Sequence, residues 1–143
     1  MEFRILGPLE AFEDGAPVAL GGRKQRALLS VLLLSANKVI STERLIDGLW
    51  EEPPANATKA VQVYVSRLRK ALGGSMPASR APGYVLELLP EQLDLTRFRQ
   101  LRSRASRDPT GAAEMLRDAL ALWRGAALEE FEDAPFARAE RLR

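Results

Sequence analysis

The sequence predicts an α+β protein in which a small mixed domain precedes an all-helical unit. Three observations support this fold class. Short segments of β-type residues fill the first twenty positions, glycine and proline pairs then separate three helical segments and a hairpin, and only helical periodicity follows Pro90. We therefore expect one domain over residues 1–89 and a second unit over residues 93–143.

The chain opens with three predicted strands that form an antiparallel meander. They cover Phe3–Leu6, Leu9–Glu13 and Pro17–Leu20. Gly7-Pro8 breaks the first pair, and Asp14-Gly15 is a dipeptide typical of a two-residue hairpin turn.

Two helices and a short extended segment follow the meander. Arg23–Ala36 has so little polar face that we expect it to be mostly buried. Val39-Ile40 reads as extended, and Ser41 can cap a second helix. That helix carries an apolar stripe and is stopped by Pro53-Pro54. The stripe consists of Leu45, Ile46, Leu49 and Trp50.

A third helix is predicted from the N-cap Asn56 to about Leu72, before the stop signal Gly73-Gly74. At about 100° per residue its apolar side comprises Ala57, Val61, Tyr64, Val65, Leu68 and Leu72. Its other side comprises Lys59, Gln62, Val63, Ser66 and Lys70, with Arg67 and Arg69 at the flanks. Val63 is either a plain exposed valine or an apolar contact for a thymine methyl group.

The positive charge of the chain is concentrated around this helix. Lys plus Arg exceed Asp plus Glu by only 21 to 19, but residues 53–86 hold five basic residues and no carboxylate. Such a segment is the electrostatic footprint of a phosphate-backbone binder, although a solvated helix face has the same composition. Its last basic residue, Arg80, lies at the tip of a predicted hairpin. The hairpin pairs Ser75–Arg80 with Tyr84–Leu88 around Ala81-Pro82-Gly83.

The second unit reads as antiparallel helices of the tetratricopeptide type. Asp94 can cap a helix that runs to about Arg107, and Asp108-Pro109 has the N-cap and N1 pattern that opens the next. The inward residues of the first helix are Leu95, Phe98, Leu101 and Ala105. The apolar stripe of the second consists of Ala112, Ala113, Leu116, Ala119, Leu120 and Trp123. An acidic loop follows over Ala127–Ala134. A third helix begins at Phe136 and runs to Arg143, and we expect it to continue, because one hairpin cannot bury its own apolar stripe.

Composition argues against an enzyme. The chain has no histidine and no cysteine, so the common bases, thiolate nucleophiles and zinc ligands are missing, and we predict no catalytic residue, cofactor or metal. Gly21-Gly22-Arg23-Lys24 lacks the spacing of a phosphate-binding loop and favours a strand-to-helix turn. The longest apolar stretch, Ala27–Ala36, is about half of a membrane span, so we expect a cytoplasmic protein without a membrane partner.

Several segments resemble the OmpR-type winged helix-turn-helix domain. They are Leu45–Trp50 before its proline-containing loop, Val61–Leu72, and Arg80–Tyr84. Leu93-Asp94-Leu95 with Phe98, and then Leu116–Gly125, are similar to the opening of the bacterial transcriptional activation domain. Together, in this order, they resemble the SARP family of transcriptional activators.

The resemblance implies a sequence-specific regulator of transcription whose third helix enters the major groove of double-stranded DNA. Lys59, Val63, Ser66 and Arg67, with Gln62 on the same face, would meet base edges or nearby phosphates. Tyr64, Arg69 and Lys70 would hold the DNA backbone, and the wing residue Arg80 would enter the minor groove.

Other implied partners are RNA polymerase and a second copy of the chain. The loop with Glu51, Glu52 and Pro54 corresponds to a polymerase-contacting segment, although a solvated helix connection is the simpler interpretation. The helical unit would help a homodimer to sit on promoter direct repeats, or would only pack on the wing. Met1 lies only two residues before the first predicted strand, so we expect no receiver domain ahead of it and no switch by receiver phosphorylation. The alternative function is a protein-interaction module that uses the helices and has no DNA target.

Overall fold

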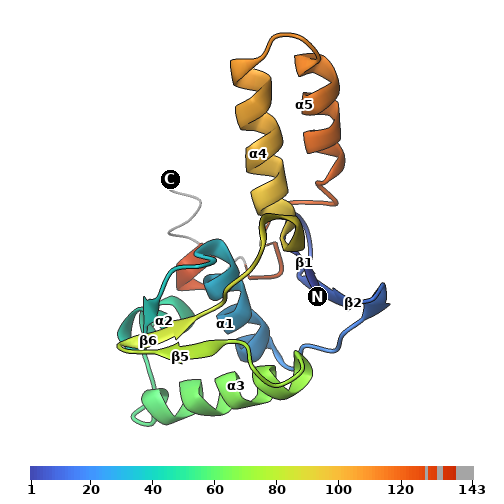
Figure 1. The fold of residues 1–143 in the computed structure, drawn as a ribbon. Coiled ribbons are helices and arrows are strands. Elements are labelled where there is room, and N and C mark those ends of the chain that lie inside the picture. Colours follow the sequence, from blue (N-terminus) through green and yellow to red (C-terminus); the bar gives the residue numbers. More distant parts are fainter. Residues whose placement is uncertain (128, 132–133, 138–143) are drawn as a thin grey trace.

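The computed structural model describes residues 1–127, 129–131 and 134–137, and its architecture confirms the predicted α+β fold class (Figure 1). The first sheet is an antiparallel meander in the order β1-β2-β3. Its strands are β1 (Glu2–Arg4), β2 (Glu10–Glu13) and β3 (Ala16–Pro17), so all three are shorter than predicted.

Three helices follow, close to the predicted positions. They are α1 (Arg23–Leu34), α2 (Thr42–Leu49) and α3 (Ala57–Ala71). The Ser41 hydroxyl oxygen accepts the Arg44 N–H at 3.1 Å, which confirms the predicted cap of α2. Asn56 does occupy the N-cap position of α3, but its side chain makes no capping hydrogen bond there.

A second sheet of order β4-β6-β5 forms the wing. The hairpin strands β5 (Ala78–Arg80) and β6 (Gly83–Val85) are shorter than predicted, while β4 (Ile40–Ser41) is the extended segment that joins α1 to α2. Ser41 pairs with Gly83 in this sheet. The wing is thereby attached to the start of α2 as well as to the chain that follows α3.

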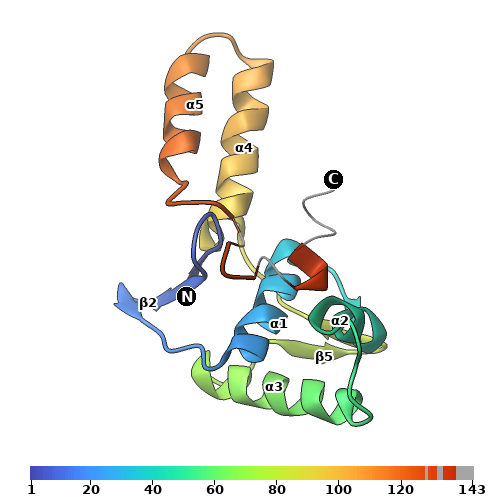
Figure 2. The ribbon, with the colours of Figure 1, turned by 180° about the vertical axis from the view of Figure 1, so that it is seen from behind.

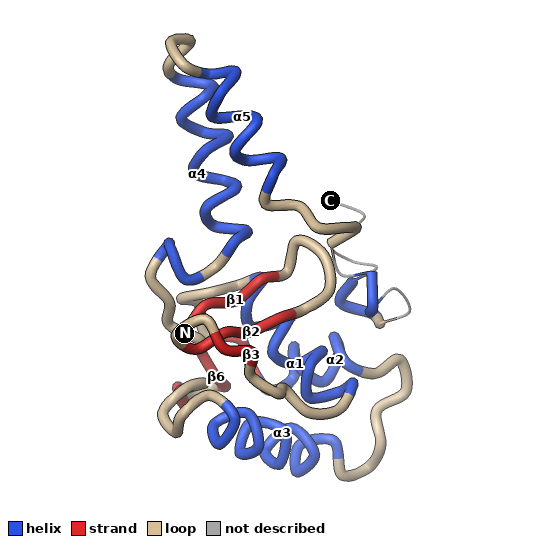
Figure 3. Tube along the Cα trace, turned by 90° about the vertical axis from the view of Figure 1, so that its right-hand side faces the viewer, coloured by secondary structure: helices blue, strands red, loops and turns tan. Residues whose placement is uncertain are grey.

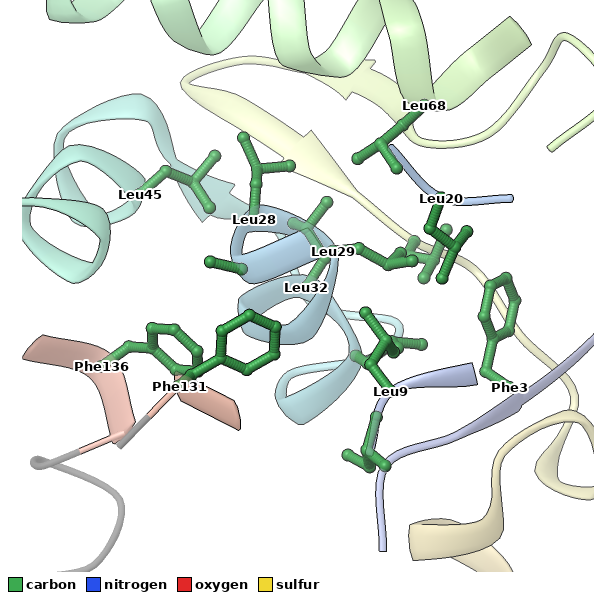
Figure 4. Close-up of a cluster of buried hydrophobic side chains, with 14 of the residues drawn as sticks. Phe3, Leu9, Leu20, Leu28, Leu29, Leu32, Leu45, Leu68, Phe131 and Phe136 are labelled. Atoms are coloured by element: carbon green, nitrogen blue, oxygen red, sulfur yellow. The ribbon is translucent and has the colours of Figure 1, made fainter. Parts of the chain in front are cut away.

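The buried core surrounds α1 (Figure 4). Leu28, Leu29 and Leu32 are fully buried, and the close-up shows them between side chains of the first sheet, α2 and α3. Because α1 is apolar on nearly all sides, it can support α3 from within while the outer face of α3 stays free.

The second unit is a helical hairpin that stands apart from the winged domain (Figure 2). After a short 3-10 turn, η1 (Pro90–Gln92), it consists of α4 (Asp94–Arg107) and α5 (Ala112–Ala121). The predicted start of α5 is wrong. Asp108 ends α4 and accepts the Thr110 N–H at 3.0 Å, and α5 begins after Gly111, whose positive φ of 79° makes the tight turn.

The α5 stripe is largely exposed among the described residues, in line with the expectation that one hairpin cannot bury its own apolar stripe. Ala119 is buried, but Leu116, Leu120 and Trp123 are 44%, 65% and 39% exposed. On α4, Leu101 and Ala105 are buried, whereas Leu95 and Phe98 are only half-buried. Trp123 meets Phe98 edge to face, with ring centroids 5.5 Å apart. Two helices bury the side chains between them and leave the neighbouring stripe open.

Asp94 does not cap its own helix, because Leu93 occupies the N-cap position. Its buried carboxylate instead accepts two backbone N–H groups of the N-terminal loop, from Ile5 at 2.9 Å and from Leu6 at 3.0 Å. Arg124, just after α5, donates its backbone N–H to the Leu6 carbonyl oxygen at 2.8 Å. The base of the hairpin therefore binds the loop after β1, as Figure 3 shows for these neighbouring segments.

The segment predicted as an acidic loop returns to the winged domain. It contains a second 3-10 turn, η2 (Glu129–Phe131). Glu130 forms a two-pronged ion pair with Arg26 of α1, with its closest N···O distance at 2.9 Å, and also accepts the Leu9 N–H. The rings of Phe131 and Phe136 pack at a tilt within the α1 core, with their centroids 5.7 Å apart (Figure 4). The predicted third helix is helical at residues 135–137, and its remainder lies outside the described residues.

We predict that Asp94→Asn lowers the free energy of unfolding by about 1–3 kcal/mol, because the two N–H groups bond to separate carboxylate oxygens and the amide NH₂ would face one of them. Urea denaturation measures this loss. Asp118→Asn, an exposed change of the same charge on α5, is the control. Equal stability of the two variants would show that the Asp94 carboxylate does not hold the loop.

We also predict that Gly83→Ala destabilises the wing. A methyl group at Gly83 would overlap the carbonyl oxygen of Ile40 on the paired strand β4, so the two strands would have to separate. The expected cost is about 1–3 kcal/mol, measured by thermal unfolding. Gly22→Ser should leave stability unchanged or slightly higher, because nothing lies near the added atom and serine is favoured at this N-cap. Unchanged unfolding of the Gly83 variant would contradict the close packing of β4 on β6.

Candidate nucleic-acid interface

The outer face of α3 is polar, cationic and exposed, as its periodicity predicts. The helix buries Ala57, Val61, Val65 and Leu68 against the core. Its exposed residues include Lys59, Gln62, Val63, Ser66, Arg67 and Lys70. Val63 is 38% exposed in the middle of this face. Figure 1 shows α3 along the lower edge of the molecule, with no other element covering its outer side among the described residues.

Tyr64, assigned by resemblance to the DNA backbone, belongs to a packed edge of α3. It is half-buried, and its ring lies 6.4 Å from that of Trp50 at the end of α2. The Lys24 ammonium group lies 5.3 Å from the centre of the Trp50 ring and donates to the Leu49 carbonyl oxygen. Burial, and secondarily the positive charge of Arg23, lower the pKa of Lys24. These contacts join α1, α2 and α3 behind the exposed face.

Arg69 is occupied by the wing. Its Nε donates to the Pro77 carbonyl oxygen at 2.8 Å, and Nη2 donates to the Ser79 hydroxyl at 2.7 Å. Both partners lie on or beside β5. The guanidinium thus ties the C-terminal half of α3 to the base of the wing hairpin, a role that sequence reasoning missed because the partners are backbone and hydroxyl groups without a motif.

Arg80 is exposed at the end of β5, close to the wing turn, but it has a carboxylate neighbour. Its Nη2 lies 2.9 Å from Oε1 of Glu87, and the two side chains are 58% and 54% exposed. Glu87 follows β6 and lies just outside the basic stretch that the sequence singles out. The ion pair reduces the positive charge that the wing presents.

The loop between α2 and α3 is exposed, including Glu51, Glu52 and Pro54. Beside it lies a pocket of about 340 Å³. The pocket is lined by Arg23, Lys24, Ala27, Leu49, Trp50, Glu51, Glu52, Ala134 and Pro135. Within the described part of the chain no three metal-ligating side chains gather, and no described helix is long and apolar enough to cross a membrane.

Two family models match the chain in succession. The model described as "Transcriptional regulatory protein, C terminal" matches residues 15–86, which hold α1, α2, α3 and the wing. The "Bacterial transcriptional activator domain" model matches residues 93–143.

Relatives with regulatory names share most of the chain. Regulatory protein AfsR of Streptomyces coelicolor is 41% identical over 150 residues, which cover all of this chain and 15% of AfsR. Transcriptional regulatory protein EmbR of Mycobacterium tuberculosis is 37% identical over 95% of this chain. The structure of M. tuberculosis EmbR in complex with a low affinity phosphopeptide superimposes with a TM-score of 0.85 at 36% identity, over 96% of this chain and 40% of that one. The chain thus spans only part of its relatives.

We predict that Glu87→Gln strengthens binding of the chain to duplex DNA at low salt, because it releases Arg80 for a phosphate or a groove. One additional phosphate contact steepens the slope of log K against log salt by about 0.9. Fluorescence anisotropy across a salt series measures it. Glu91→Gln in η1 makes the same charge change away from the wing. If both variants gain equally in affinity for duplex DNA, the change in net charge and not the release of Arg80 is responsible.

Proposed function

Because the chain belongs to the SARP family of transcriptional activators, we propose that it binds a specific sequence of duplex DNA and activates transcription beside RNA polymerase. The observation that carries this proposal is the exposed, donor-rich outer face of α3. An α-helix fits the major groove, where each base pair presents its own pattern of donors, acceptors and methyl groups.

Arg67 is our choice for base readout. It is exposed at the flank of the outer face, and a guanidinium matches the O6 and N7 atoms of guanine with two hydrogen bonds. Ser66 and Gln62 beside it supply neutral hydrogen-bonding groups, and Val63 supplies the apolar surface for a thymine methyl group. Lys59 and Lys70 lie on the same exposed face and suit phosphates, because an ammonium group acts as a point charge without planar geometry.

Tyr64 and Arg69 are better suited to positioning than to direct contact with DNA. Arg69 sets the distance between α3 and the wing through its bonds to Pro77 and Ser79. That distance decides whether α3 and Arg80 reach adjacent grooves together. Tyr64 supports α3 from the Trp50 side.

We extend the proposal to partners and organisation. Residues 1–89 would bind DNA, while residues 93–143 would help two copies to occupy direct repeats. The exposed loop at Glu51, Glu52 and Pro54 would face RNA polymerase. The protein would work in the bacterial cytoplasm and carry out no chemistry of its own, in keeping with a sequence without histidine or cysteine.

A second candidate function is a protein-interaction module without a DNA target. The exposed apolar side chains Leu116, Leu120 and Trp123 favour it, because apolar side chains that line up on one helix commonly mark an interaction surface. It predicts that the chain shifts no promoter fragment in a gel mobility assay at moderate salt.

We predict that Arg67→Ala reduces affinity for the selected operator by about 1–3 kcal/mol, because it removes a two-pronged base contact, and leaves binding to random DNA nearly unchanged. Operators selected from genomic fragments, followed by anisotropy titrations on operator and random duplexes, measure this. If operator and random DNA weaken equally, Arg67 contacts phosphate and not a base.

Lys70→Ala is the matched variant on the same face. It should weaken binding to both duplexes to a similar degree and flatten the salt slope by about one, since only a phosphate contact is lost. A selective loss of operator binding in this variant would contradict the phosphate role of Lys70.

A further inference from the structure

A second cationic surface lies on α4, outside the candidate DNA interface. The helix carries five arginines within fourteen residues, namely Arg97, Arg99, Arg102, Arg104 and Arg107. The one carboxylate within the helix is Asp94, whose oxygens are turned to the Ile5 and Leu6 N–H groups. The charge on the rest of α4 is therefore not balanced from within the helix.

Part of this charge forms one continuous stripe. A groove of about 360 Å³ runs along α4 and is lined by Thr96, Arg99, Gln100, Ser103, Arg104 and Arg107. Counted from Thr96, the other five lining residues follow at three, four, seven, eight and eleven positions. This spacing places all six on one helix face over roughly 16 Å. We name Arg99, Arg104 and Arg107 the α4 arginine row. Its polar neighbours are an amide and two hydroxyls, and no carboxylate lines the groove.

The arginines that hold the fold together behave differently. Arg26 binds Glu130, Arg69 binds Pro77 and Ser79, and Arg124 binds Glu10 and the Pro8 carbonyl oxygen. In the α4 arginine row, Arg107 donates only to Ser103 of its own helix. In the described part of the chain, no ion pair joins an arginine of the row to a carboxylate, although the side chains are exposed.

The position of α4 separates this surface from the DNA interface. In Figures 1, 2 and 3 the hairpin of α4 and α5 rises from the side of the winged domain opposite α3. A duplex seated on the outer face of α3 lies at the other end of the molecule. The phosphates of that duplex are therefore not the counter-charge of the row, and a protein partner fits better.

We propose that the α4 arginine row is a docking surface for an acidic peptide segment of a protein partner. Guanidinium groups pair with carboxylates through two parallel N–H···O bonds, and three of them along one helix face match aspartates or glutamates placed one helical turn apart. The hydroxyls of Thr96 and Ser103 and the amide of Gln100 add hydrogen bonds between the charges. The choice of a protein over nucleic acid as the partner rests on the proposed binding of duplex DNA by α3.

The test uses the full chain and a labelled helical peptide with glutamates four residues apart, titrated by fluorescence anisotropy at low and at moderate salt. We expect salt-sensitive binding that is lost with the peptide carrying glutamine in place of glutamate. Arg99→Glu and Arg104→Glu should each weaken binding by about fivefold or more, because each removes one pair and adds a repulsion. Arg117→Glu on α5 makes the same charge change outside the groove and should have little effect.

Three results would overturn the proposal. The first is no binding of the glutamate peptide at low salt. The second is an equal loss in the Arg117 variant, which would mean general attraction to a basic protein. The third is a parallel loss of operator binding in the Arg99 and Arg104 variants, which would assign the row to nucleic acid. Thermal unfolding of each variant verifies that the fold is kept, and operator binding by the unmodified chain tests the proposed function separately.

Discussion

The structure depends on how the loop between β1 and β2 satisfies its backbone. Residues 5–9 run between the core and the helical hairpin without strand partners, and Gly7-Pro8 prevents a regular continuation of the sheet. Buried N–H and carbonyl groups need hydrogen-bonding partners, and an unmet donor costs about 1–3 kcal/mol. Here Asp94 accepts from Ile5 and Leu6, while Glu130 and Arg26 together satisfy Leu9. Residues from the C-terminal half of the chain thereby supply the hydrogen-bond acceptors that this N-terminal loop needs.

This constraint reaches α3 through the core. The loop and η2 both pack on α1, and α1 in turn supports the buried side of α3. Arg69 then connects α3 with β5, and Ser41 connects β4 with β6. The helix α3 and the wing are therefore held by shared contacts, while the exposed side chains of α3 have no packing role.

Features that depend on residues close together in the sequence are predicted well. The two faces of α3, the cap at Ser41 and the hairpin after Arg69 follow from helical periodicity and turn residues, and all are present. The missed features join distant segments. Asp94 lies 89 residues from Ile5, and Glu130 lies 104 residues from Arg26. Nothing local distinguishes an aspartate that caps its own helix from one that accepts a distant N–H, and an amphipathic period in α5 does not reveal whether a partner covers Leu120.

The return of Phe131, Phe136 and Ala137 to the α1 core has a consequence for biosynthesis. Domains generally fold from the N-terminus as the ribosome releases them. In this chain the first domain in sequence order cannot close its hydrophobic centre until residues more than forty positions past the wing have emerged. A nascent polypeptide halted between α5 and η2 would leave α1 partly uncovered, with an apolar surface open to chaperones or to aggregation.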